Sequence, residues 1–346
     1  MIKEIRYKNF KALRDTTLPL GRFTLIVGAN GTGKTTTMNA LKIINNLDND
    51  NFEKFLTSGL LIEKENLQIE VFWKNFSYRR TVSLKETTMN HLFDENQNNL
   101  GGSKGSFTNT LKETYRHESE GEAIKSFKLF SFEPDKIAAA VSIQPNIELK
   151  EDGGGLSGVL DQLRDTHPEK FEELNRELNT WFYEYDRILF EIPENGKKAF
   201  LLRTTIGKNI IKANDLSHGT LLALAYLTLA YLPNPLQIVA FEEPERGIHP
   251  RLLRNIQEAM DRLAYPENYG EKREPVQVIA TTHSPYLLDL YKDRREEIVI
   301  ADKDENGVHF ERLTDLPNIE KILQEQDAPL GDVWFSGILG GVPAQL

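Results

Sequence analysis

The spacing of apolar residues predicts three short strands and a helix at the start of the chain. Apolar side chains alternate with polar ones along the first stretches, as in strands with one buried face. A helical pattern follows from Lys34 to about Asn46. The residues that define the strands are Ile2, Ile5 and Tyr7, then Leu18 and Leu20, then Phe23, Leu25 and Val27; those that define the buried helix face are Met38, Leu41, Ile43 and Ile44.

The middle of the chain alternates between strand-like, polar and helical patterns. Residues 67–84 have the alternation of an antiparallel hairpin with a turn at Lys74-Asn75. Residues 86–124 are polar, and we expect a mobile, partly disordered insertion there. The glycines of 151–155 read as a break before a helical region that starts at Pro168. Core packing is the favoured interpretation of its apolar positions, which are Phe171, Leu174, Leu178, Trp181 and Phe182.

Two hydrophobic strands are predicted in the second half, each followed by polar residues. A second hairpin, 187–192 with 199–205 and a turn at Asn195-Gly196, precedes them. The run 236–241 leads into Glu242-Glu243, and the run 276–281 leads into Thr282-His283. Such continuous apolar runs are typical of buried parallel strands. Because open α/β sheets bind ligands at the carboxyl ends of their strands, we expect these residues and the loop after Val27 to share one edge.

The loop 28–35, GANGTGKT, fits the pattern GxxxxGK[ST] between a predicted strand and a predicted helix. Glycines allow the backbone to wrap phosphates, and the N–H groups of the loop and helix start face the anion. We expect Lys34 to reach the β- and γ-phosphates and the Thr35 hydroxyl to ligate Mg²⁺. The expected cofactors are therefore ATP and Mg²⁺, and the loop residues expected to bind them are Gly28, Asn30, Gly31, Gly33, Lys34, Thr35 and Thr36.

Composition narrows the class of protein. The 346 residues have a formal net charge of −10 and contain no cysteine, which excludes disulfides, zinc–thiolate sites and thiol nucleophiles. The longest apolar stretch, 221–232, is too short to cross a bilayer, and the N-terminus begins directly with strand-like alternation. We expect a cytoplasmic protein that does not enter a membrane. The excess of acidic over basic residues argues against a generally basic surface that binds nucleic acid.

The adjacent carboxylates Glu242 and Glu243 suggest hydrolytic chemistry. Two acids at the end of an apolar strand are costly unless a cation offsets them, and Mg²⁺–nucleotide would supply one. Glu242 would then hold the metal and Glu243 would polarise the attacking water as a general base. The alternative is that both are solvated loop acids.

Taken in order, the motifs 28–35, 216–220 (LSHGT), 238–243 and 282–285 (THSP) resemble those of ABC-type ATPases. The soluble RecF/SMC/OLD-like branch of AAA-type ATPases is the most similar group, and the resemblance runs from 5–11 to 330–335. It implies an α/β P-loop NTPase fold of ABC-ATPase type, with a mixed central sheet, flanking helices, an antiparallel β subdomain and a helical lobe that carries the signature motif. The division expected is 1–150 for the ATP-binding lobe, 151–235 for the helical lobe and 236–346 for the remaining core.

The resemblance assigns roles to four further segments. In this family Leu216–Thr220 is the signature motif, whose Ser217 and Gly219 would meet the γ-phosphate held by the opposite protomer; the residues alone suggest a plain helix N-cap. His283 corresponds to the switch histidine, although a lone histidine after a strand is usually an ordinary polar residue. Gln144 is the candidate Q-loop ligand of Mg²⁺, with a surface glutamine as the alternative. The segment 245–250 takes the D-loop position, where His249 is expected to be structural.

These assignments predict a catalytic set of Glu243, His283 and Lys34 and a metal set of Thr35, Glu242 and Gln144. The expected function is an ATP-hydrolysing switch that forms a homodimer or higher oligomer around ATP and controls a separate, nuclease-like effector in DNA repair or phage defence. The 71 residues between Gln144 and Leu216 are too few for SMC coiled coils, and the 63 after His283 are too few for the nuclease domain of OLD proteins.

Two other functions stay open: a transporter's nucleotide-binding subunit, and a nucleotide-sensing scaffold with negligible turnover. The Ser-His-Gly-Thr signature and Glu242 in the Asp position argue against the transporter. DNA binding is a further possibility, through phosphate contacts with Arg79, Arg80, Arg251, Arg254, Lys272 and Arg273, although a solvated charged face explains these residues better.

Overall fold

The computed structural model describes residues 1–45, 67–72, 76–82, 88–94, 99–104, 127–193, 196–326 and 328–340. Contacts divide the chain into two compact units. The first comprises Met1–Lys128, Gln237–Glu242 and Gln277–Leu346, and the second comprises Leu129–Leu236 and Glu243–Val276. The units are therefore interleaved along the chain, and residues 243–276, which follow the predicted metal ligand, cluster with the helical lobe.

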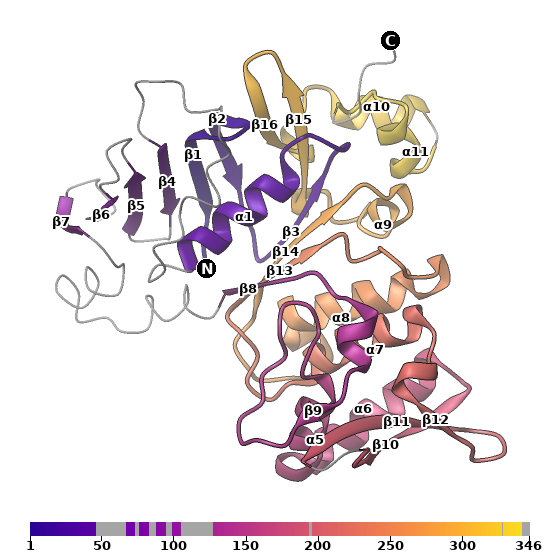
Figure 1. Cartoon of the computed structure of the whole chain (residues 1–346). Coiled ribbons are helices and arrows are strands. Elements are labelled where there is room, and N and C mark those ends of the chain that lie inside the picture. Colours follow the sequence, from indigo (N-terminus) through magenta and orange to yellow (C-terminus); the bar gives the residue numbers. More distant parts are fainter. Residues whose placement is uncertain are drawn as a thin grey trace. The chain divides into compact units, whose positions relative to one another are not determined.

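An antiparallel sheet forms one layer of the first unit (Figure 1). The three strands predicted at the start of the chain and the hairpin at 67–84 are confirmed. The sheet order is β2-β1-β4-β5-β6-β7. Its strands are β1 (Glu4–Phe10), β2 (Leu13–Pro19), β4 (Leu67–Phe72), β5 (Phe76–Val82), β6 (Thr88–Asp94) and β7 (Asn99–Lys104).

The prediction of a mobile insertion at 86–124 is wrong for two segments. Residues 88–94 form β6 and residues 99–104 form β7, which pair with each other and extend the sheet beyond β5. Polar composition hid these strands because an antiparallel edge gains its backbone hydrogen bonds from its neighbour, whatever its side chains are. The other residues of 86–124 lie outside the described part of the chain.

A mixed sheet forms the other layer and carries the predicted parallel strands. Its order is β16-β15-β3-β14-β13-β8, where β14 is parallel to both β3 and β13, β15 is parallel to β3, and β16 is antiparallel to β15. All five residues of β3 are buried and all six of β14 are buried, as continuous apolar runs predict. The strands are β3 (Phe23–Val27), β8 (Phe127–Phe130), β13 (Ile238–Glu242), β14 (Gln277–Thr282), β15 (Ile298–Asp304) and β16 (Gly307–Arg312).

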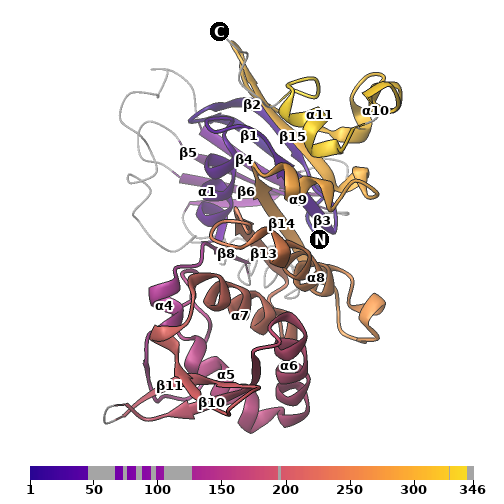
Figure 2. The same cartoon turned by 90° about the vertical axis from the view of Figure 1, so that its right-hand side faces the viewer.

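Helices of the first unit follow the mixed sheet's strands. The predicted helix after the glycine loop is α1 (Lys34–Asn45), and the expected end at about Asn46 lies outside the described residues. It lies beside β1 and β4 in both views (Figures 1 and 2), and its Met38 side chain is fully buried. The short α9 (Pro285–Asp289) follows β14, and α10 (Ile319–Gln326) and α11 (Leu330–Phe335) follow β16.

The second unit packs helices against a β hairpin, as Figure 2 shows for α5, α6, β10 and β11. The predicted hairpin is confirmed, with β10 paired to β11 in antiparallel register. Phe171, Leu174, Leu178 and Trp181 of α6 are buried, which confirms their core role. The elements are α4 (Pro134–Ala138), β9 (Val141–Ser142), α5 (Leu156–Thr166), α6 (Pro168–Trp181), β10 (Tyr185–Glu191), β11 (Lys197–Thr204), β12 (Ile210–Lys212), α7 (His218–Tyr231) and α8 (Leu253–Ala264).

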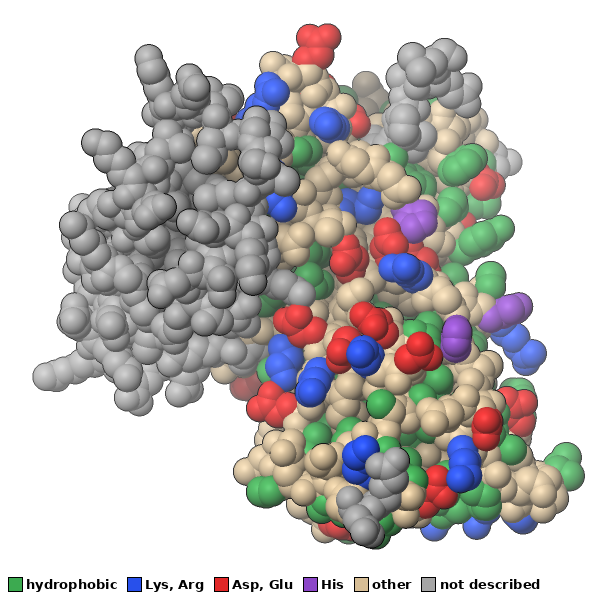
Figure 3. All heavy atoms as spheres, in the orientation of Figure 1, with side chains coloured by type: hydrophobic (Ala, Val, Ile, Leu, Met, Phe, Trp, Pro, Cys, Tyr) green, Lys and Arg blue, Asp and Glu red, His purple; other side chains and the backbone are tan. Residues whose placement is uncertain are grey.

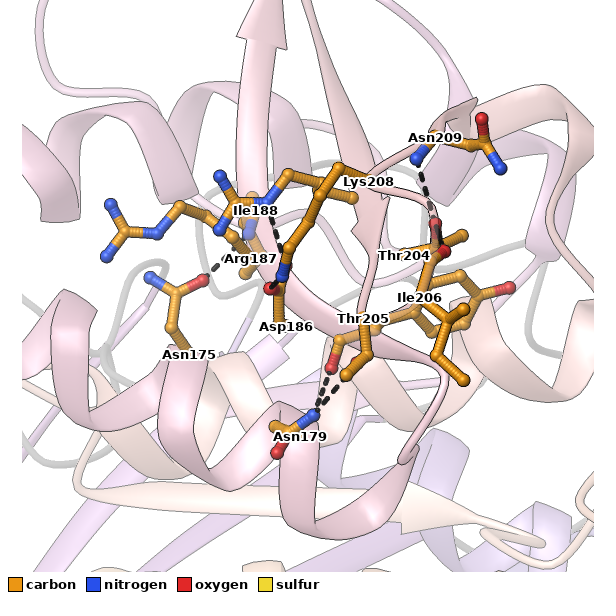
Figure 4. Close-up of polar contacts among 12 residues, drawn as sticks. Asn175, Asn179, Asp186, Arg187, Ile188, Thr204, Thr205, Ile206, Lys208 and Asn209 are labelled. Atoms are coloured by element: carbon orange, nitrogen blue, oxygen red, sulfur yellow. Dashed lines mark hydrogen bonds and ion pairs between the residues drawn. The ribbon is translucent and has the colours of Figure 1, made fainter.

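Side-chain amides join α6 to this hairpin (Figure 4). The Asn175 carbonyl oxygen accepts from the Ile188 backbone N–H at 2.7 Å, and Asn179 donates to the Tyr185 carbonyl oxygen at 2.8 Å. Next to Tyr185, Asp186 accepts from Arg203 of β11 at 2.8 Å and also pairs with Lys208. The two asparagine hydrogen bonds tie the hairpin to α6, and the Asp186 pairs join its two strands.

Candidate functional site

Within the first unit, the ends of β3, β13 and β14 bring the glycine loop, Glu242 and His283 to one edge. The parallel registers place Glu242 opposite Thr281 and Val27 opposite Thr282. The loop after Val27, Glu242 and the residues after Thr282 therefore begin at the same edge of the sheet. This confirms the common edge expected from the two apolar runs.

The loop 28–33 is shaped by glycine backbone and close packing. Gly31 and Gly33 have φ values of +85° and +83°, which L side chains rarely adopt. A Cβ on Gly28 would lie 2.5 Å from the Ala301 carbonyl oxygen and 2.6 Å from the Thr32 hydroxyl oxygen, so only glycine fits there. The Thr32 hydroxyl donates to the Ala29 carbonyl oxygen at 2.8 Å and closes the loop. The loop is thus preformed in a conformation that suits an anion.

Lys34 lies inside this loop and Thr35 reaches the next strand. The Lys34 side chain is buried, and its Nζ donates to the carbonyl oxygens of Gly28 at 2.6 Å and Ala29 at 2.8 Å. The Thr35 hydroxyl donates to Oε1 of Glu242 at 2.5 Å. A hydroxyl and a carboxylate held together are oxygen donors of the kind that Mg²⁺ prefers, so these two residues fit a magnesium site. Asn30, in the loop, is exposed, and Thr36, in the first turn of α1, is half-buried.

Glu243 has an unusual backbone conformation. Its φ is +48°, in the left-handed region where a residue with a side chain is strained by about 1–2 kcal/mol. Its carbonyl oxygen accepts from the Arg246 N–H at 2.8 Å, so Glu243 opens a tight turn directly after β13. Strain of this kind is common where function requires a particular side-chain direction.

His283 is exposed at the point where β14 ends. The next residue, Ser284, is held by two hydrogen bonds. Its N–H donates to the Thr282 hydroxyl at 2.9 Å, and its side chain caps α9. Pro285 then occupies the first turn of that helix. The backbone on the far side of His283 is therefore well fixed.

The predicted signature residues lie at the start of α7, in the second unit. Ser217 is the N-cap, and its hydroxyl oxygen accepts from the Thr220 N–H at 3.1 Å. The helix begins at His218, three residues before the apolar stretch 221–232, and every residue from Thr220 to Tyr231 is buried. The N-cap expected from the residues alone is present, and a cap leaves other N–H groups of the first turn free for an anion.

Gln144 and His249 have different surroundings. Gln144 is exposed, two residues after β9, and belongs to the second unit, whereas Thr35 and Glu242 belong to the first. The role of Gln144 as a metal ligand stays a prediction. The His249 Nδ1 accepts from the Arg251 N–H at 3.2 Å and caps a short 3₁₀ turn, a structural contact of the kind expected.

The sequence analysis did not identify the residues of β15 and β16 that pack against the phosphate loop. Ala301 of β15 and Val308 of β16 lie against Gly28 and Gly33; a Cβ on Gly33 would be 3.0 Å from Val308 Cγ2. The apolar run at 298–301 could have indicated a strand. Nothing in the sequence indicates that this strand lies beside β3.

Comparison with known proteins shows the family of the chain. Residues 23–289 match the model of the family described as "AAA domain, putative AbiEii toxin, Type IV TA system". The chain belongs to this family. The match covers the phosphate loop, the start of α7 and the Glu242-Glu243 pair, so these motifs of the AAA-domain protein all lie within the residues that match the family. The resemblance to ABC-type ATPases of the RecF/SMC/OLD-like branch is confirmed.

A curated relative and two solved structures agree. A 44-residue segment is 50% identical to the OLD nuclease of Thermus scotoductus, and it spans 13% of this chain and 8% of that protein. An Smc head bound to the C-terminal winged-helix domain of ScpA has a TM-score of 0.53 at 16% identity over 90% of this chain and 96% of the other. The second structure is an Smc head domain derived from Pyrococcus furiosus, with an extended coiled coil, bound to the C-terminal domain of ScpA. Its TM-score is 0.55 and its sequence identity is 14%, and the match covers 95% of this chain and 100% of the other. At these identities the likeness shows the P-loop ABC-ATPase fold.

The described residues contain neither a membrane-spanning helix nor a protein-only metal cluster. No helix there is both long and apolar enough to span a bilayer. No group of three or more His, Asp or Glu side chains there forms a protein-only metal cluster. A Mg²⁺ held by Thr35 and Glu242 would take most of its other ligands from nucleotide and water, as is usual for Mg²⁺ at phosphates.

Proposed function

We propose that this protein is an ATP-driven switch that binds and hydrolyses ATP with Mg²⁺ as a dimer. The observation that carries the proposal is the arrangement at the end of β3 and β13. Lys34 lies inside a glycine loop, and Thr35 is hydrogen-bonded to Glu242 at 2.5 Å. A buried cation, a helix start and paired oxygen donors together suit a triphosphate and its metal.

Each residue has a distinct part in the proposed reaction. The N–H groups of the loop hold the phosphates, and Lys34 would exchange its carbonyl partners for the β- and γ-phosphate oxygens. Thr35 and Glu242 would hold Mg²⁺, which supplies charge neutralisation at the phosphates when bound. Glu243 would accept the proton of the attacking water, and His283 would contact the γ-phosphate or that water. Gln144 is proposed as a further ligand of the metal.

A second protomer would complete each site. The α7 start offers Ser217 and the backbone of Gly219, while its first turn carries no Lys or Arg. An anion there would need cations from elsewhere, and the loop of another copy has one in Lys34. ATP would thereby bind the dimer more tightly than the monomer and shift the equilibrium toward it.

The decisive experiment is the solution mass of Glu243→Gln, measured by light scattering after size exclusion. We expect a mass that doubles only with ATP and Mg²⁺, because binding is retained while hydrolysis is blocked. A high mass in both conditions would mean constitutive assembly. A monomer in both would contradict the composite site. If the wild-type protein dimerises with ATP but shows no turnover, it is a nucleotide-sensing scaffold.

The partner and pathway follow from the relatives only as a proposal. The family description names a toxin–antitoxin system, the curated relative is a nuclease, and both solved structures have ScpA bound. We propose that the closed dimer controls a separate nuclease-like effector in phage defence or DNA repair, in the cytoplasm. Lobes at 1–150, 151–235 and 236–346 are the proposed functional divisions.

DNA binding is not part of the proposed switch. Arg273 is half-buried and donates to Glu271 at 2.5 Å and to the Arg262 carbonyl oxygen at 2.5 Å, so it supports the fold instead of facing a phosphate. On the face drawn in Figure 3, acidic and basic side chains of the described residues are interspersed. A steep fall of DNA affinity with salt would support a DNA-binding role for the remaining basic residues.

A further inference from the structure

The short helix α9 starts two residues after His283 and packs on α11. The two helices lie side by side in both cartoon views (Figures 1 and 2). They belong to the first unit, as does the strand β14 that precedes His283. The pairing of β14 with β3 ends at Thr282, opposite Val27. The sheet therefore orders the chain up to Thr282, and the contacts of α9 order it beyond His283.

Gly331 of α11 lies against the backbone at the start of α9. A Cβ on Gly331 would lie 2.5 Å from the Pro285 carbonyl oxygen and 2.8 Å from the Pro285 Cβ, so only glycine fits there. Gly331 is inside the helix and does not have the left-handed backbone that often requires glycine. Because glycine disfavours a helix, the close approach to Pro285 explains this residue better than the helix itself does.

A hydrogen bond joins the other end of α9 to the start of α11. Oδ1 of Asp289 accepts from the Gly331 N–H at 2.7 Å. Pro329, the residue before α11, gives that helix no side-chain cap, so Asp289 supplies one from α9. Asp289 is the last residue of α9, whose last turn has no basic residue. A negative charge is unfavourable at the carbonyl end of its own helix and favourable at the N–H end of another, so Asp289 stabilises α11.

The helix α11 is a firm anchor for these contacts. Four of its six residues are buried, namely Leu330, Gly331, Val333 and Trp334. The turn that follows reaches β15, because a Cβ on Gly340 would lie 3.1 Å from Asp302 Oδ2. The residue before Asp302 is Ala301, which packs against Gly28 of the phosphate loop. The segment 330–340 thus contacts both the helix after His283 and the strand behind the phosphate loop.

We propose that Asp289 and Gly331 are positioning residues, which hold α9 on α11 and thereby fix the course of the chain at His283. The β14–β3 pairing fixes the chain before His283, and the contacts with α11 fix it afterwards. His283 would then keep a constant place relative to the phosphate loop. The effect on turnover rests on the proposed ATPase function, because His283 is proposed there to contact the γ-phosphate or the attacking water.

Four variants test the contacts between the two helices. Asp289→Ala removes the acceptor of the Gly331 N–H, whereas Asp289→Asn keeps an oxygen that can accept the same hydrogen bond. Gly331→Ala changes no charge and forces α11 away from Pro285. Asp332→Ala is the matched control for Asp289→Ala, since Asp332 is also an acidic residue at the start of α11 but is exposed.

We expect Asp289→Ala and Gly331→Ala to lower kcat by about tenfold and to keep KM for ATP within about twofold, because a misplaced catalytic group affects the transition state more than binding. Asp289→Asn should recover most of kcat, and Asp332→Ala should keep it within about twofold. Hydrogen exchange gives a readout that does not depend on turnover. The amides of Ser284 and Leu288, which are hydrogen-bonded at the start of α9, should exchange faster in Asp289→Ala and Gly331→Ala than in Asp332→Ala.

A double-mutant cycle with His283→Ala separates positioning from a general loss of folding. In the His283→Ala background, Asp289→Ala should lower kcat by less than about twofold, because the group that it positions is already gone. A further tenfold loss in that background would overturn the positioning role. An equal fall of kcat in Asp332→Ala, or unchanged exchange of Ser284 and Leu288 in both Asp289→Ala and Gly331→Ala, would also overturn it.

The same measurements distinguish this inference from the proposed function. If His283→Ala leaves kcat unchanged, or the wild type has no turnover, the proposed catalytic role of His283 is wrong. The exchange of Ser284 and Leu288 then decides alone whether Asp289 and Gly331 hold the chain there. If Gly331→Ala does not fold, Asp289→Ala with its asparagine rescue decides by the same criteria.

Discussion

The helix starts of α1 and α7 are both predicted to face a phosphate, but they are built differently. At α1 the glycine loop, the buried Lys34 and the Thr35–Glu242 hydrogen bond supply backbone donors, a cation and oxygen donors in one unit of one chain. At α7 the Ser217 cap and the backbone are all that the first turn offers. The α1 start therefore has every group that we propose for binding a phosphate, whereas the α7 start lacks a cation. In the proposed dimer, the partner protomer would supply that missing charge.

The two helices also differ in what surrounds them. All residues of α7 from Thr220 to Tyr231 are buried, so the helix is anchored on every side. Close packing also constrains the loop 28–33 before α1, but there the backbone of Gly28 packs against the backbone of Ala301. We therefore expect substitutions at the α1 start to change both nucleotide affinity and the conformation of the loop. At the α7 start, we expect substitutions to change folding stability and dimer formation independently of each other.

The largest expected effect is that of Lys34→Ala. It removes the cation from the complete site, and loss of charge-assisted hydrogen bonds to phosphates should weaken ATP binding by about a hundredfold or more. Titration calorimetry measures the affinity, with the melting temperature as the control for folding. Retained tight binding would show that the loop is not the phosphate site.

Gly28→Ala should damage the same site through sterics. Its Cβ would lie 2.5 Å from the Ala301 carbonyl oxygen, so loop or β15 must shift, at a cost of about 1–3 kcal/mol of stability together with weaker ATP binding. Urea denaturation and nucleotide titration check the two effects. A fully stable variant with wild-type affinity would mean that the loop tolerates an open conformation.

Gly219→Ala is the matched change at the α7 start. Its Cβ would meet only the Gly247 carbonyl oxygen at 3.6 Å, an ordinary contact, and alanine favours a helix over glycine by about 0.5–1 kcal/mol. We expect unchanged or slightly higher stability, unchanged ATP binding by the monomer, and reduced ATP-dependent dimerisation. Normal dimerisation would place the partner's phosphate elsewhere.

Two substitutions at Ser217 distinguish the cap from the interface. Ser217→Ala removes the acceptor of the Thr220 N–H and should cost about 1 kcal/mol of stability. Ser217→Arg should in addition block dimer formation and turnover, since a bulky cation would fill the space intended for the partner's nucleotide. Normal ATP hydrolysis by the arginine variant would contradict the composite site.

The smallest expected effect concerns acid stability in the second unit. Hydrogen bonds from Arg203 and Lys208 lower the pKa of Asp186 from 3.8 to about 2 (Figure 4). A lowered pKa in the folded state contributes stability that is present above pH 3.8 and is lost as the pH falls toward 2. Asp186→Asn should therefore make the unfolding free energy less dependent on pH in this window, as urea titrations at several pH values would show. An unchanged pH dependence would mean that the ion pairs do not persist in solution.

Much of the architecture could be predicted because it depends on local patterns. The period-two strands 4–10 and 13–19, the apolar runs of β3, β13 and β14 and the loop motif each carry their own signal. The strands 88–94 and 99–104 could not be predicted, since their pairing, not their composition, makes them strands. The place of Gln144 could not be predicted either, because its neighbours along the chain say nothing about which unit it joins.

The sequence by itself singled out the candidate residues for phosphate chemistry: type, spacing and the apolar runs before them indicate Lys34, Thr35, Glu242 and Glu243, and the family resemblance adds His283. Only the tertiary structure decided how they are held. It placed β15 behind Gly28, gave Glu243 a left-handed backbone, and set the Gly247 turn against Leu222 of α7, twenty-five residues earlier in the chain. The physical reason is that motifs are local in sequence, whereas close packing and burial join segments that no local pattern relates.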